Sequence, residues 1–383
     1  MAPSSMSTAT LPLPSADSPP PHIAVSAEPV LGKEAPAPIK LLLSYEHKVS
    51  IIVVSFNTRE LLRQCLKSTL AECGRLPAGG TAEILVVDNA STDGSPEMVE
   101  SEFAEAALPY GSAQVRLIRS AVNLGFAGAN NVAMRQALGR YIVLLNSDAL
   151  FHAGALRMAI QRMDLNTSAG VGGARLVGPQ GEWQPSARSF PTLWHVFVVF
   201  SGLAGRFPKS RLFGAFDRTW ASANLSAEID WVPGAFSIMR REALARTGLF
   251  DPRFFLYCEE VDLCRRIKAE GFKVLYWPDV VVTHIGGESG RQLSDLEFSD
   301  SDSQVTLWRM RATLLYFRKH HGVRVWGIRL LEDAMHCMRW LRNRWSRNPA
   351  RRLRAEEARL CLALMHQAWL DTNGGRVSPP QPW

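Results

Sequence analysis

The feature that most constrains this chain is a series of short apolar segments that alternate with helical patterns from residue 49 onward. Residues 49–55 (VSIIVVS), 83–87 (EILVV) and 141–145 (YIVLL) are apolar runs of strand length. Such runs are typical of strands that are buried on both faces of a parallel sheet. Because helical patterns separate them, the sequence predicts an α/β fold with a doubly wound, Rossmann-like half. In such a half, ligands bind at the carboxyl ends of the strands.

The rest of the chain has a different pattern. Residues 171–177 and 235–239 are predicted strands, and residues 259–270 form a predicted helix followed by a strand at 272–276. Beyond residue 303 the pattern is helical and basic. We therefore expect these segments: a disordered Pro/Ser-rich tail at 1–47, a two-part domain at 48–302 (halves 48–150 and 151–302), and a basic helical extension at 303–383.

Composition limits the classes of function. Nine of the 23 prolines fall within the first 38 residues, which predicts disorder there. The net charge of +7 favours phosphate-rich ligands or an anionic membrane surface, but it is too small to indicate nucleic acid by itself. Six cysteines without C-x-x-C spacing predict free thiols in a cytosolic protein. The longest apolar stretch, at 195–205, is too short to span a membrane.

Three polar clusters follow predicted strands. Turn chemistry explains any one of them, but three clusters at strand ends favour a ligand site. An acid directly after a strand, such as Asp88, can accept hydrogen bonds from a ribose hydroxyl or a nucleobase. Asp148 suits Mg²⁺ or Mn²⁺, which prefers oxygen ligands and bridges phosphates. The candidate residues in these clusters are Ser55, Asn57, Thr58, Asp88, Asn89, Asp93, Asn146 and Asp148.

An acidic cluster and a histidine lie farther along. Glu259, Glu260 and Asp262 begin a predicted helix, where acids interact favourably with the helix dipole. Because strongly apolar residues precede them, they are also candidates for the rim of a pocket, with a raised pKa and a general-base role. His284 follows an apolar run and is either structural or a ligand. The glycine-rich run behind it, at 286–290, is a candidate loop that closes over a bound nucleotide.

At these positions the sequence resembles the family-2 glycosyltransferases, particularly their rhamnosyltransferase-like branch. The resemblance extends over residues 49 to about 320, and the order of several motifs makes it specific. The motifs that carry it are VSIIVVSFNT (49–58), EILVVDNASTDGS (83–95), NLGFAGANN (123–131), LLNSD (144–148), FDPRFFLYCEEVDLCRR (250–266) and THIGGES (283–289).

The resemblance implies a GT-A fold, with 48–302 as the catalytic domain, and an inverting single displacement at the anomeric carbon of a nucleotide sugar. It implies that Asp88 binds the nucleoside, that Asp148 is the metal-binding acid of a D-x-D motif, and that Glu260 is the general base. Asp262 would orient the base or the acceptor, and His284 would complete metal or diphosphate binding. The donor-binding loop would contain Asn123, Gly125, Phe126 and Asn130.

The sequence departs from the family pattern in two places. The D-x-D position reads Asn146-Ser147-Asp148, so the first acid is absent, although an N-x-D form is common in the rhamnosyltransferase-like branch. The acidic pair is Glu259-Glu260 where Glu-Asp is more familiar, and either carboxylate can act as the base. Processive synthases of the family add a Q-x-x-R-W motif and spanning helices, which this sequence lacks. We therefore expect an enzyme that adds a single sugar.

The resemblance suggests L-rhamnose from dTDP-L-rhamnose as the sugar, and a saccharide or polyprenyl-linked acceptor in cell-surface polysaccharide synthesis. Residues 339–354 hold seven arginines and no acid, interleaved with tryptophan and leucine. This composition fits either an anionic membrane surface on the cytoplasmic side or a helix pair packed on the catalytic domain. Two alternative functions stay open: a catalytically silent scaffold that binds sugar nucleotides, and a nucleotidyltransferase.

Overall fold

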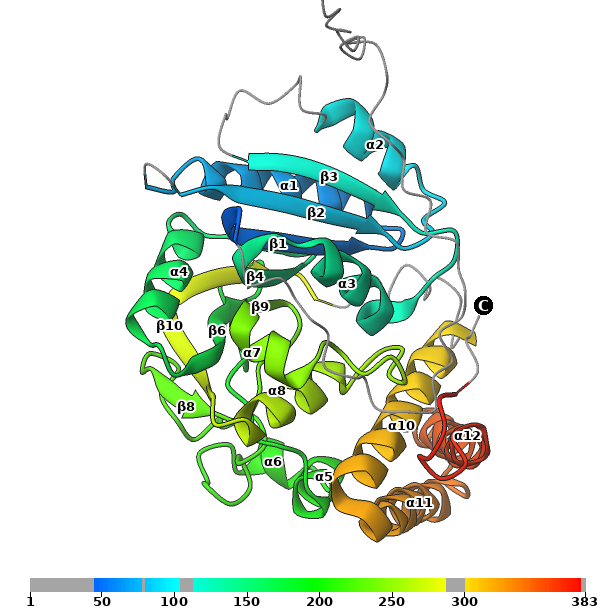
Figure 1. Cartoon of the computed structure of the whole chain (residues 1–383). Coiled ribbons are helices and arrows are strands. Elements are labelled where there is room, and N and C mark those ends of the chain that lie inside the picture. The colour runs from blue at the N-terminus through cyan, green and yellow to red at the C-terminus, as the bar shows by residue number, and fades with distance from the viewer. Residues whose placement is uncertain (1–44, 78–79, 104–112, 287–299, 380–383) are drawn as a thin grey trace, which may run out of the picture.

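One mixed β-sheet organises the molecule. The computed structural model describes residues 45–77, 80–103, 113–286 and 300–379. Within them, ten strands form a sheet in the order β3-β2-β1-β4-β9-β6-β10-β5, with β7 beside β6 and β8 beside β10 (Figure 1). Residues 1–44 of the predicted tail lie outside the described residues. The division into three segments stays a prediction.

The first half has the predicted alternation of strands and helices. Strand β1 lies between β2 and β4, all pairings in this group are parallel, and the order β3-β2-β1-β4 is that of a doubly wound sheet. The elements are β1 (His47–Ser55), α1 (Arg59–Cys73), β2 (Ala82–Asp88), α2 (Ser95–Glu102), β3 (Ala113–Arg119), α3 (Gly125–Gln136) and β4 (Gly139–Asn146).

The second half completes the sheet with both strand directions. β9 runs antiparallel to β4 and to β6, while β10 is parallel to β6 and antiparallel to β5. The elements are β5 (Ala149–Phe151), α4 (Ala155–Leu165), β6 (Ala169–Val177), β7 (Trp183–Gln184), α5 (Leu193–Phe200), α6 (Leu203–Arg206), β8 (Ala227–Ile229), β9 (Phe236–Arg240), α7 (Arg241–Thr247), α8 (Glu259–Ala269) and β10 (Lys273–His284). This mixed sheet, with helices on both faces, is the GT-A arrangement that the sequence predicted.

Alternation along the strands divides the core into two layers. Val49, Ile51 and Val53 of β1 are buried on the face covered by α1, α2 and α4. Ile52 points to the opposite face, which packs against α3, α7 and α8. Successive side chains of a strand point to opposite faces, so a fully apolar strand such as β1 is stable only when both faces are covered.

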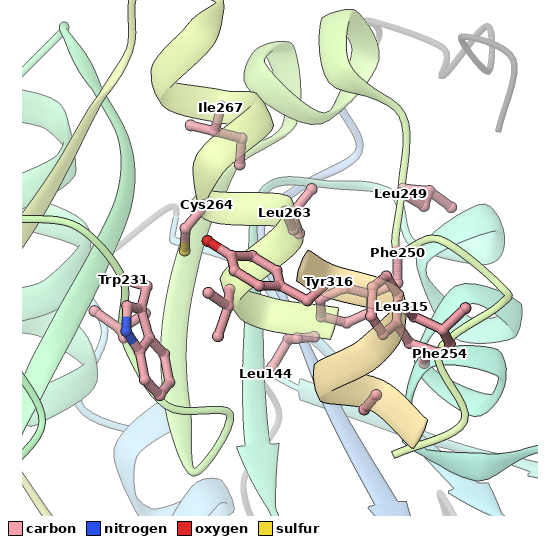
Figure 2. Packing of buried hydrophobic residues seen from close by; sticks show 14 of the residues in the cluster. Leu144, Trp231, Leu249, Phe250, Phe254, Leu263, Cys264, Ile267, Leu315 and Tyr316 are labelled. Carbon is pink, nitrogen blue, oxygen red and sulfur yellow. The ribbon is translucent and has the colours of Figure 1, made fainter. Parts of the chain in front are cut away.

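The C-terminal helices extend the second of these layers. They are α10 (Asp300–His321), a short 3₁₀ turn (Gly322–Arg324), α11 (Val325–Asn343) and α12 (Pro349–Asp371). Figure 2 shows Leu315 and Tyr316 of α10 among Phe250, Phe254 and Leu263, which lie in and just before α8. Helix α10 therefore packs against the helices and loops that cover this face of the sheet.

Two further findings concern the whole described chain. All six cysteines are free, as their spacing predicted. Among the residues that the structure describes, no helix is both long enough and apolar enough to cross a membrane.

A buried ion-pair network ties α10 to the start of α8. The Nζ of Lys319 lies 2.7 Å from an oxygen of Asp251 and 2.7 Å from an oxygen of Asp262. The side chains of both aspartates are fully buried. Burial alone would raise the pKa of Asp262, but the hydrogen bond from His320 and the charges of Arg266 and Lys319 outweigh it and hold the pKa well below its usual range.

Replacing the lysine tests this network. Lys319→Met leaves two buried carboxylates short of a partner, so we expect a loss of about 3 kcal/mol in the free energy of unfolding at pH 7. Because the folded state lowers the pKa of Asp262, the stabilisation is present above the unfolded value near 4 and is lost as the pH falls below it. The deficit of the variant should therefore shrink below about pH 4.

Urea titrations at neutral and acid pH measure this difference. Lys209→Met is the matched control, because Lys209 is exposed and forms no ion pair in the described structure. An equal deficit at both pH values would contradict the electrostatic explanation.

Candidate active site

The polar ends of three neighbouring strands meet through their side chains. The hydroxyls of Ser55 and Thr58 lie 3.0 Å apart, and Thr58 Oγ1 donates to Ser147 Oγ at 2.9 Å. Strand β1 lies between β2 and β4 in parallel register, with Ser55 opposite Asp88 and Val54 opposite Asn146. The structure thus brings together the three clusters that the sequence analysis selected.

The first cluster is also joined to the loop after β2. Asn57 has a positive φ of 52°, a left-handed conformation that asparagine tolerates. Its backbone N–H donates to Ser91 Oγ at 3.0 Å, and its Oδ1 accepts from the backbone N–H of Thr92 at 2.8 Å. The carboxylate of Asp93 accepts from the backbone N–H groups of Arg59 and Ser95. The side chains of Asn57 and Asp93 are therefore used to shape the loop.

Asp88 retains an oxygen that the protein does not use. Its Oδ2 accepts from the backbone N–H of Ser91 at 3.2 Å, while its Oδ1 is buried and has no hydrogen-bond partner among the described residues. Burial raises the pKa of this carboxyl, although the hydrogen bonds from Ser91 oppose the shift. A buried acceptor without a partner is costly, so Asp88 suits a ligand that brings a donor.

The predicted donor loop is held in shape by amide side chains. Asn89 donates from Nδ2 to Asn123 Oδ1 at 2.8 Å, and its own Oδ1 accepts from the backbone N–H of Leu124. Asn123 Oδ1 also accepts from the backbone N–H of Gly125. Asn130 is buried and donates from its side chain to the carbonyl of Phe126. The amides of Asn89, Asn123 and Asn130 therefore position the loop backbone.

This loop touches the segment that precedes the acidic cluster. The backbone N–H of Phe126 donates to the carbonyl of Phe255 at 2.8 Å. Gly125 has a φ of +71°, and a Cβ placed on it would lie 2.3 Å from that same carbonyl oxygen. Only glycine allows this approach, which links the predicted donor loop to the segment before the acidic cluster.

Asp148 and His284 meet because β10 pairs with β5. The antiparallel register sets His284 opposite Ala149, and the Nε2 of His284 lies 3.6 Å from Asp148 Oδ1. Gln184 holds the other ring nitrogen, with Oε1 at 3.0 Å from Nδ1, and the backbone N–H of Gly286 donates to Asp148 Oδ2. Residues 287–290 of the predicted closing loop lie outside the described residues.

This pair fits a divalent cation that takes its other ligands from substrate. The described residues form no cluster of three or more His, Cys, Asp and Glu side chains. Mg²⁺ is commonly held by one or two carboxylates together with substrate phosphates and water, and imidazole is a ligand of other divalent metals. The carboxylate of Asp148 and the adjacent imidazole of His284, which Gln184 orients, supply one ligand of each kind.

The acidic cluster begins on a strained turn. Tyr257 and Cys258 both have positive φ, 74° and 64°, directly before α8. Such conformations cost of order 1 kcal/mol or more each and occur mainly at functional sites. Glu259 is buried and Glu260 is half-buried, and the Oε2 of each has no hydrogen-bond partner in the described structure.

The two glutamates have different electrostatic environments. Burial raises the pKa of Glu259 well above its usual value, and the charge of Glu260 raises it further. Burial also raises the pKa of Glu260, but the backbone N–H of Gly234 and a hydrogen bond from Glu259 oppose the shift. This arrangement favours a protonated Glu259 that donates to an ionised Glu260.

Residues before β9 link this pair to the Asp148 loop. Gly234 contacts Glu260, and the carbonyl of its neighbour Ala235 accepts from the backbone N–H of Asn146 at 3.1 Å. The buried Asp262, in contrast, is committed to Lys319, His320 and Arg266. Its carboxylate therefore anchors α8 and is not available to accept a proton at neutral pH.

Glu260 lies on the wall of an apolar pocket of about 250 Å³. The pocket is enclosed by α5, the start of α8, α10 and α11, so the C-terminal extension forms part of it. Arg309 of α10 and Glu332 of α11 are its other charged residues. The lining residues are Pro191, His195, Val196, Val199, Phe200, Phe216, Trp231, Tyr257, Cys258, Glu260, Val261, Arg309, Thr313, Tyr316, Phe317 and Glu332.

Sequence reasoning missed Gln184, Arg309 and Glu332. The first orients His284, and the other two face the pocket of Glu260. No local pattern marks them. An acid on the buried face of a helix, such as Glu332, is only weak evidence for a functional site. The sequence does not show which residues pack against that face.

Comparisons with known proteins agree with the motifs. Residues 50–247, just over half of the chain, match the family model described as Glycosyl transferase family 2. The N-acetylglucosaminyl-diphospho-decaprenol L-rhamnosyltransferase of Mycobacterium tuberculosis (strain H37Rv) is 27% identical over 214 residues, which are 52% of this chain and 66% of that protein. This chain thus spans just under two thirds of that relative.

Two further proteins are similar. Rhamnosyltransferase WbbL of Escherichia coli (strain K12) is 25% identical over 206 residues, which are 51% of this chain and 70% of that protein. Among solved structures, the mannosyltransferase PcManGT of Pyrobaculum calidifontis is 20% identical with a TM-score of 0.48, covering 86% of this chain and 76% of that one.

The buried Glu332 predicts a pH-dependent stability. Burial raises the pKa of Glu332 to about 7. Because the folded value exceeds the unfolded value near 4.5, ionisation weakens the folded state as the pH rises through 7. We expect Glu332→Gln to be more stable than the parent by about 2–3 kcal/mol at pH 8 and nearly equal at pH 5. Urea unfolding at both pH values measures this difference, and Glu356→Gln at an exposed position is the control. A stability difference between Glu332→Gln and the parent that does not change with pH would refute the prediction.

Proposed function

The chain belongs to glycosyl transferase family 2, and on that premise we propose that it transfers a sugar from a nucleotide donor with inversion at the anomeric carbon. We propose L-rhamnose from dTDP-L-rhamnose as the sugar, and a saccharide or polyprenyl-linked saccharide as the acceptor, in cell-surface polysaccharide synthesis. The names of the mycobacterial and E. coli relatives support rhamnose. The observation that carries the proposal is the half-buried Glu260 on the pocket wall, beside a second glutamate.

Glu260 is the proposed general base. It takes the proton of the acceptor hydroxyl while that oxygen attacks the anomeric carbon on the face opposite the nucleotide. A new carbon–oxygen bond forms, the bond to the diphosphate oxygen breaks, and the nucleoside diphosphate leaves with the electron pair. Burial raises the pKa of the Glu260 carboxyl, and a carboxylate with a raised pKa is a stronger base for this proton transfer.

Glu259 is the proposed proton-bearing partner. Burial and the charge of Glu260 raise the pKa of the Glu259 carboxyl, which favours the protonated form that donates a hydrogen bond to Glu260. This hydrogen bond orients the base. Asp262 acts farther away, by fixing the start of α8 through Lys319 and His320.

Asp88 and the loop at Asn123–Gly125 are the proposed nucleoside site. The unpartnered Oδ1 of Asp88 can accept a hydrogen bond from the base or ribose. Ser55, Asn57, Thr58, Asn89 and Asp93 build the surrounding loops, and Phe126, Asn130 and Asn146 complete them. The proposal gives most of these side chains a positioning role.

Asp148 and His284 would hold Mg²⁺ or Mn²⁺, which neutralises negative charge on a departing diphosphate. Gln184 fixes the ring of His284 for this role. The Gly286 backbone N–H, which donates to Asp148, keeps the carboxylate in place.

The apolar pocket is the proposed acceptor site. Its lining is mostly aromatic and aliphatic, with Glu260 at the wall, so it suits an acceptor with apolar surface next to the reacting hydroxyl. A polyprenyl-linked acceptor would bring the enzyme to the inner face of the cytoplasmic membrane. We propose peripheral contact there through the basic C-terminal helices.

A donor panel tests the activity. The protein is incubated with dTDP-, UDP- and GDP-sugars and Mg²⁺ or Mn²⁺, with and without EDTA, and release of nucleoside diphosphate is followed. We expect metal-dependent release from one donor. Asp148→Asn should weaken metal-dependent donor binding by about 10-fold or more, while Glu270→Gln on the exposed end of α8 should change nothing. Tight nucleotide binding that ignores metal and Asp148, with no turnover, would instead favour the scaffold.

The two glutamates give a sharper prediction. Glu260→Gln should lower the transfer rate by about 10²- to 10⁴-fold with donor affinity unchanged, because it removes the base but no donor contact. Glu259→Gln should retain most of the activity, because a neutral amide resembles the protonated carboxyl that it replaces. Rates and donor affinities of both variants provide the measurement. A severe loss in Glu259→Gln with near-normal turnover in Glu260→Gln would reverse the assignment.

A further inference from the structure

A second pocket lies away from the sheet edge, between α5, α11 and α12. Its volume is about 640 Å³, and its rim is formed by Arg339 and Arg342 of α11 and Arg351 and Arg354 of α12. None of these four guanidinium groups forms an ion pair or a hydrogen bond within the described structure. Among the described residues that line the pocket, Glu357 is the only acid, and it forms no ion pair with another described residue.

The floor of the pocket holds buried polar groups. His336 is only 4% exposed and lines the pocket, and its Nε2 has no hydrogen-bond partner among the described residues. Its ring packs edge-on against Phe200, with centroids 5.4 Å apart. Asn343 is also buried and lines the same pocket. A buried histidine with an unsatisfied ring nitrogen, in the lining of a basic pocket, fits a site for a polar ligand.

The placement of the arginines is unfavourable without a counter-ion. Arg351 and Arg354 follow Pro349 near the beginning of α12, and no acid lies in its first turn. The N-terminus of a helix carries partial positive charge, so cations there are repelled. Four clustered arginines also repel one another. An anion in the pocket would relieve both repulsions, and guanidinium groups bind phosphate with two parallel hydrogen bonds.

The surroundings of the pocket identify the source of that anion. Met338, Leu341, Trp345 and Leu353 are exposed by 43–76% on the same two helices and the turn between them. Exposed tryptophan and aliphatic side chains beside arginines are the pattern of a surface that lies at the headgroup level of a membrane. A lipid would contact these apolar side chains as well as the arginines, whereas a free phosphate would contact the arginines alone.

We propose that the pocket between α5, α11 and α12 binds the phosphate of an anionic phospholipid, with Arg339, Arg342, Arg351 and Arg354 as its ligands. The inference rests on the membrane contact within the proposed function and adds a defined site to it. It does not depend on sugar transfer, because lipid binding is measured without a donor or an acceptor.

Vesicle sedimentation tests the site. The full chain is mixed with phosphatidylcholine vesicles that contain or lack phosphatidylglycerol. Arg342→Ala/Arg354→Ala removes two pocket charges. Arg347→Ala/Arg352→Ala removes two charges from the same exposed segment, outside the pocket lining. We expect affinity for the anionic vesicles to fall about 10- to 30-fold in the pocket variant and less than about threefold in the control.

Three outcomes would overturn the proposal. The first is wild-type binding that does not depend on phosphatidylglycerol. The second is an equal loss in both double variants, which would mean that the whole basic surface acts without a site. The third combines two results. Inorganic phosphate raises the thermal unfolding temperature of the wild type but not of the pocket variant, and the pocket variant binds vesicles as well as the wild type does. The ligand would then be a free anion.

A readout of turnover separates this inference from the proposed function. Nucleoside diphosphate release, with a soluble acceptor or by donor hydrolysis, should be the same in the pocket variant as in the wild type. Loss of vesicle binding with normal release supports the lipid site. If no donor is turned over but the pocket variant still loses vesicle binding, the transfer proposal fails and the lipid site stands.

Discussion

Parallel pairing of β2, β1 and β4 is the constraint on which the candidate site depends. Their register sets Ser55 opposite Asp88 and Val54 opposite Asn146, so the chain leaves all three strands at one edge of the sheet. Hydrogen bonds from Thr58 to Ser147 and from the Thr92 backbone to Asn57 then join the three loops. A slip of one residue would turn every side chain of β1 to the other face and disrupt its packing against both layers, which favours this register.

The candidate catalytic acids depend on a different and more distant support. Glu259 and Glu260 begin a helix whose first turn is fixed by the buried Asp262, and Asp262 is neutralised by Lys319 and His320 of α10. Those residues lie 57 and 58 positions away in sequence. The C-terminal helices therefore contribute to the candidate active site in two ways: they hold the acids in place, and they line the pocket that contains Glu260.

The same helices carry a cluster of arginines on their outer side. α10 is covered on the inside by the catalytic domain, whereas the junction of α11 and α12 carries arginines without acidic partners around a buried histidine. Packing and membrane contact, which the composition of this region left as alternatives, are thus compatible. One face of the extension packs on the core, and the proposed anion site lies on another.

Much of this protein was determined by its sequence alone. Apolar runs with period-2 burial and helical repeats between them determine the doubly wound half, because these patterns act locally. Asp88, Asp148, Glu259, Glu260 and His284 were recognisable because polar residues that interrupt apolar strands, in this order, match the family motifs.

Only the tertiary structure decided how those residues differ. The raised pKa values of Glu259 and Glu260 come from burial, and burial depends on what packs against them. Asp262 has the same chemical group and lies in the same helical turn, yet Lys319 and His320 commit it to an ion-pair network. Gln184 and Glu332 reach the site from elements that no local pattern connects to it. Desolvation and charge pairing are properties of contacts in space, so a linear pattern cannot specify them.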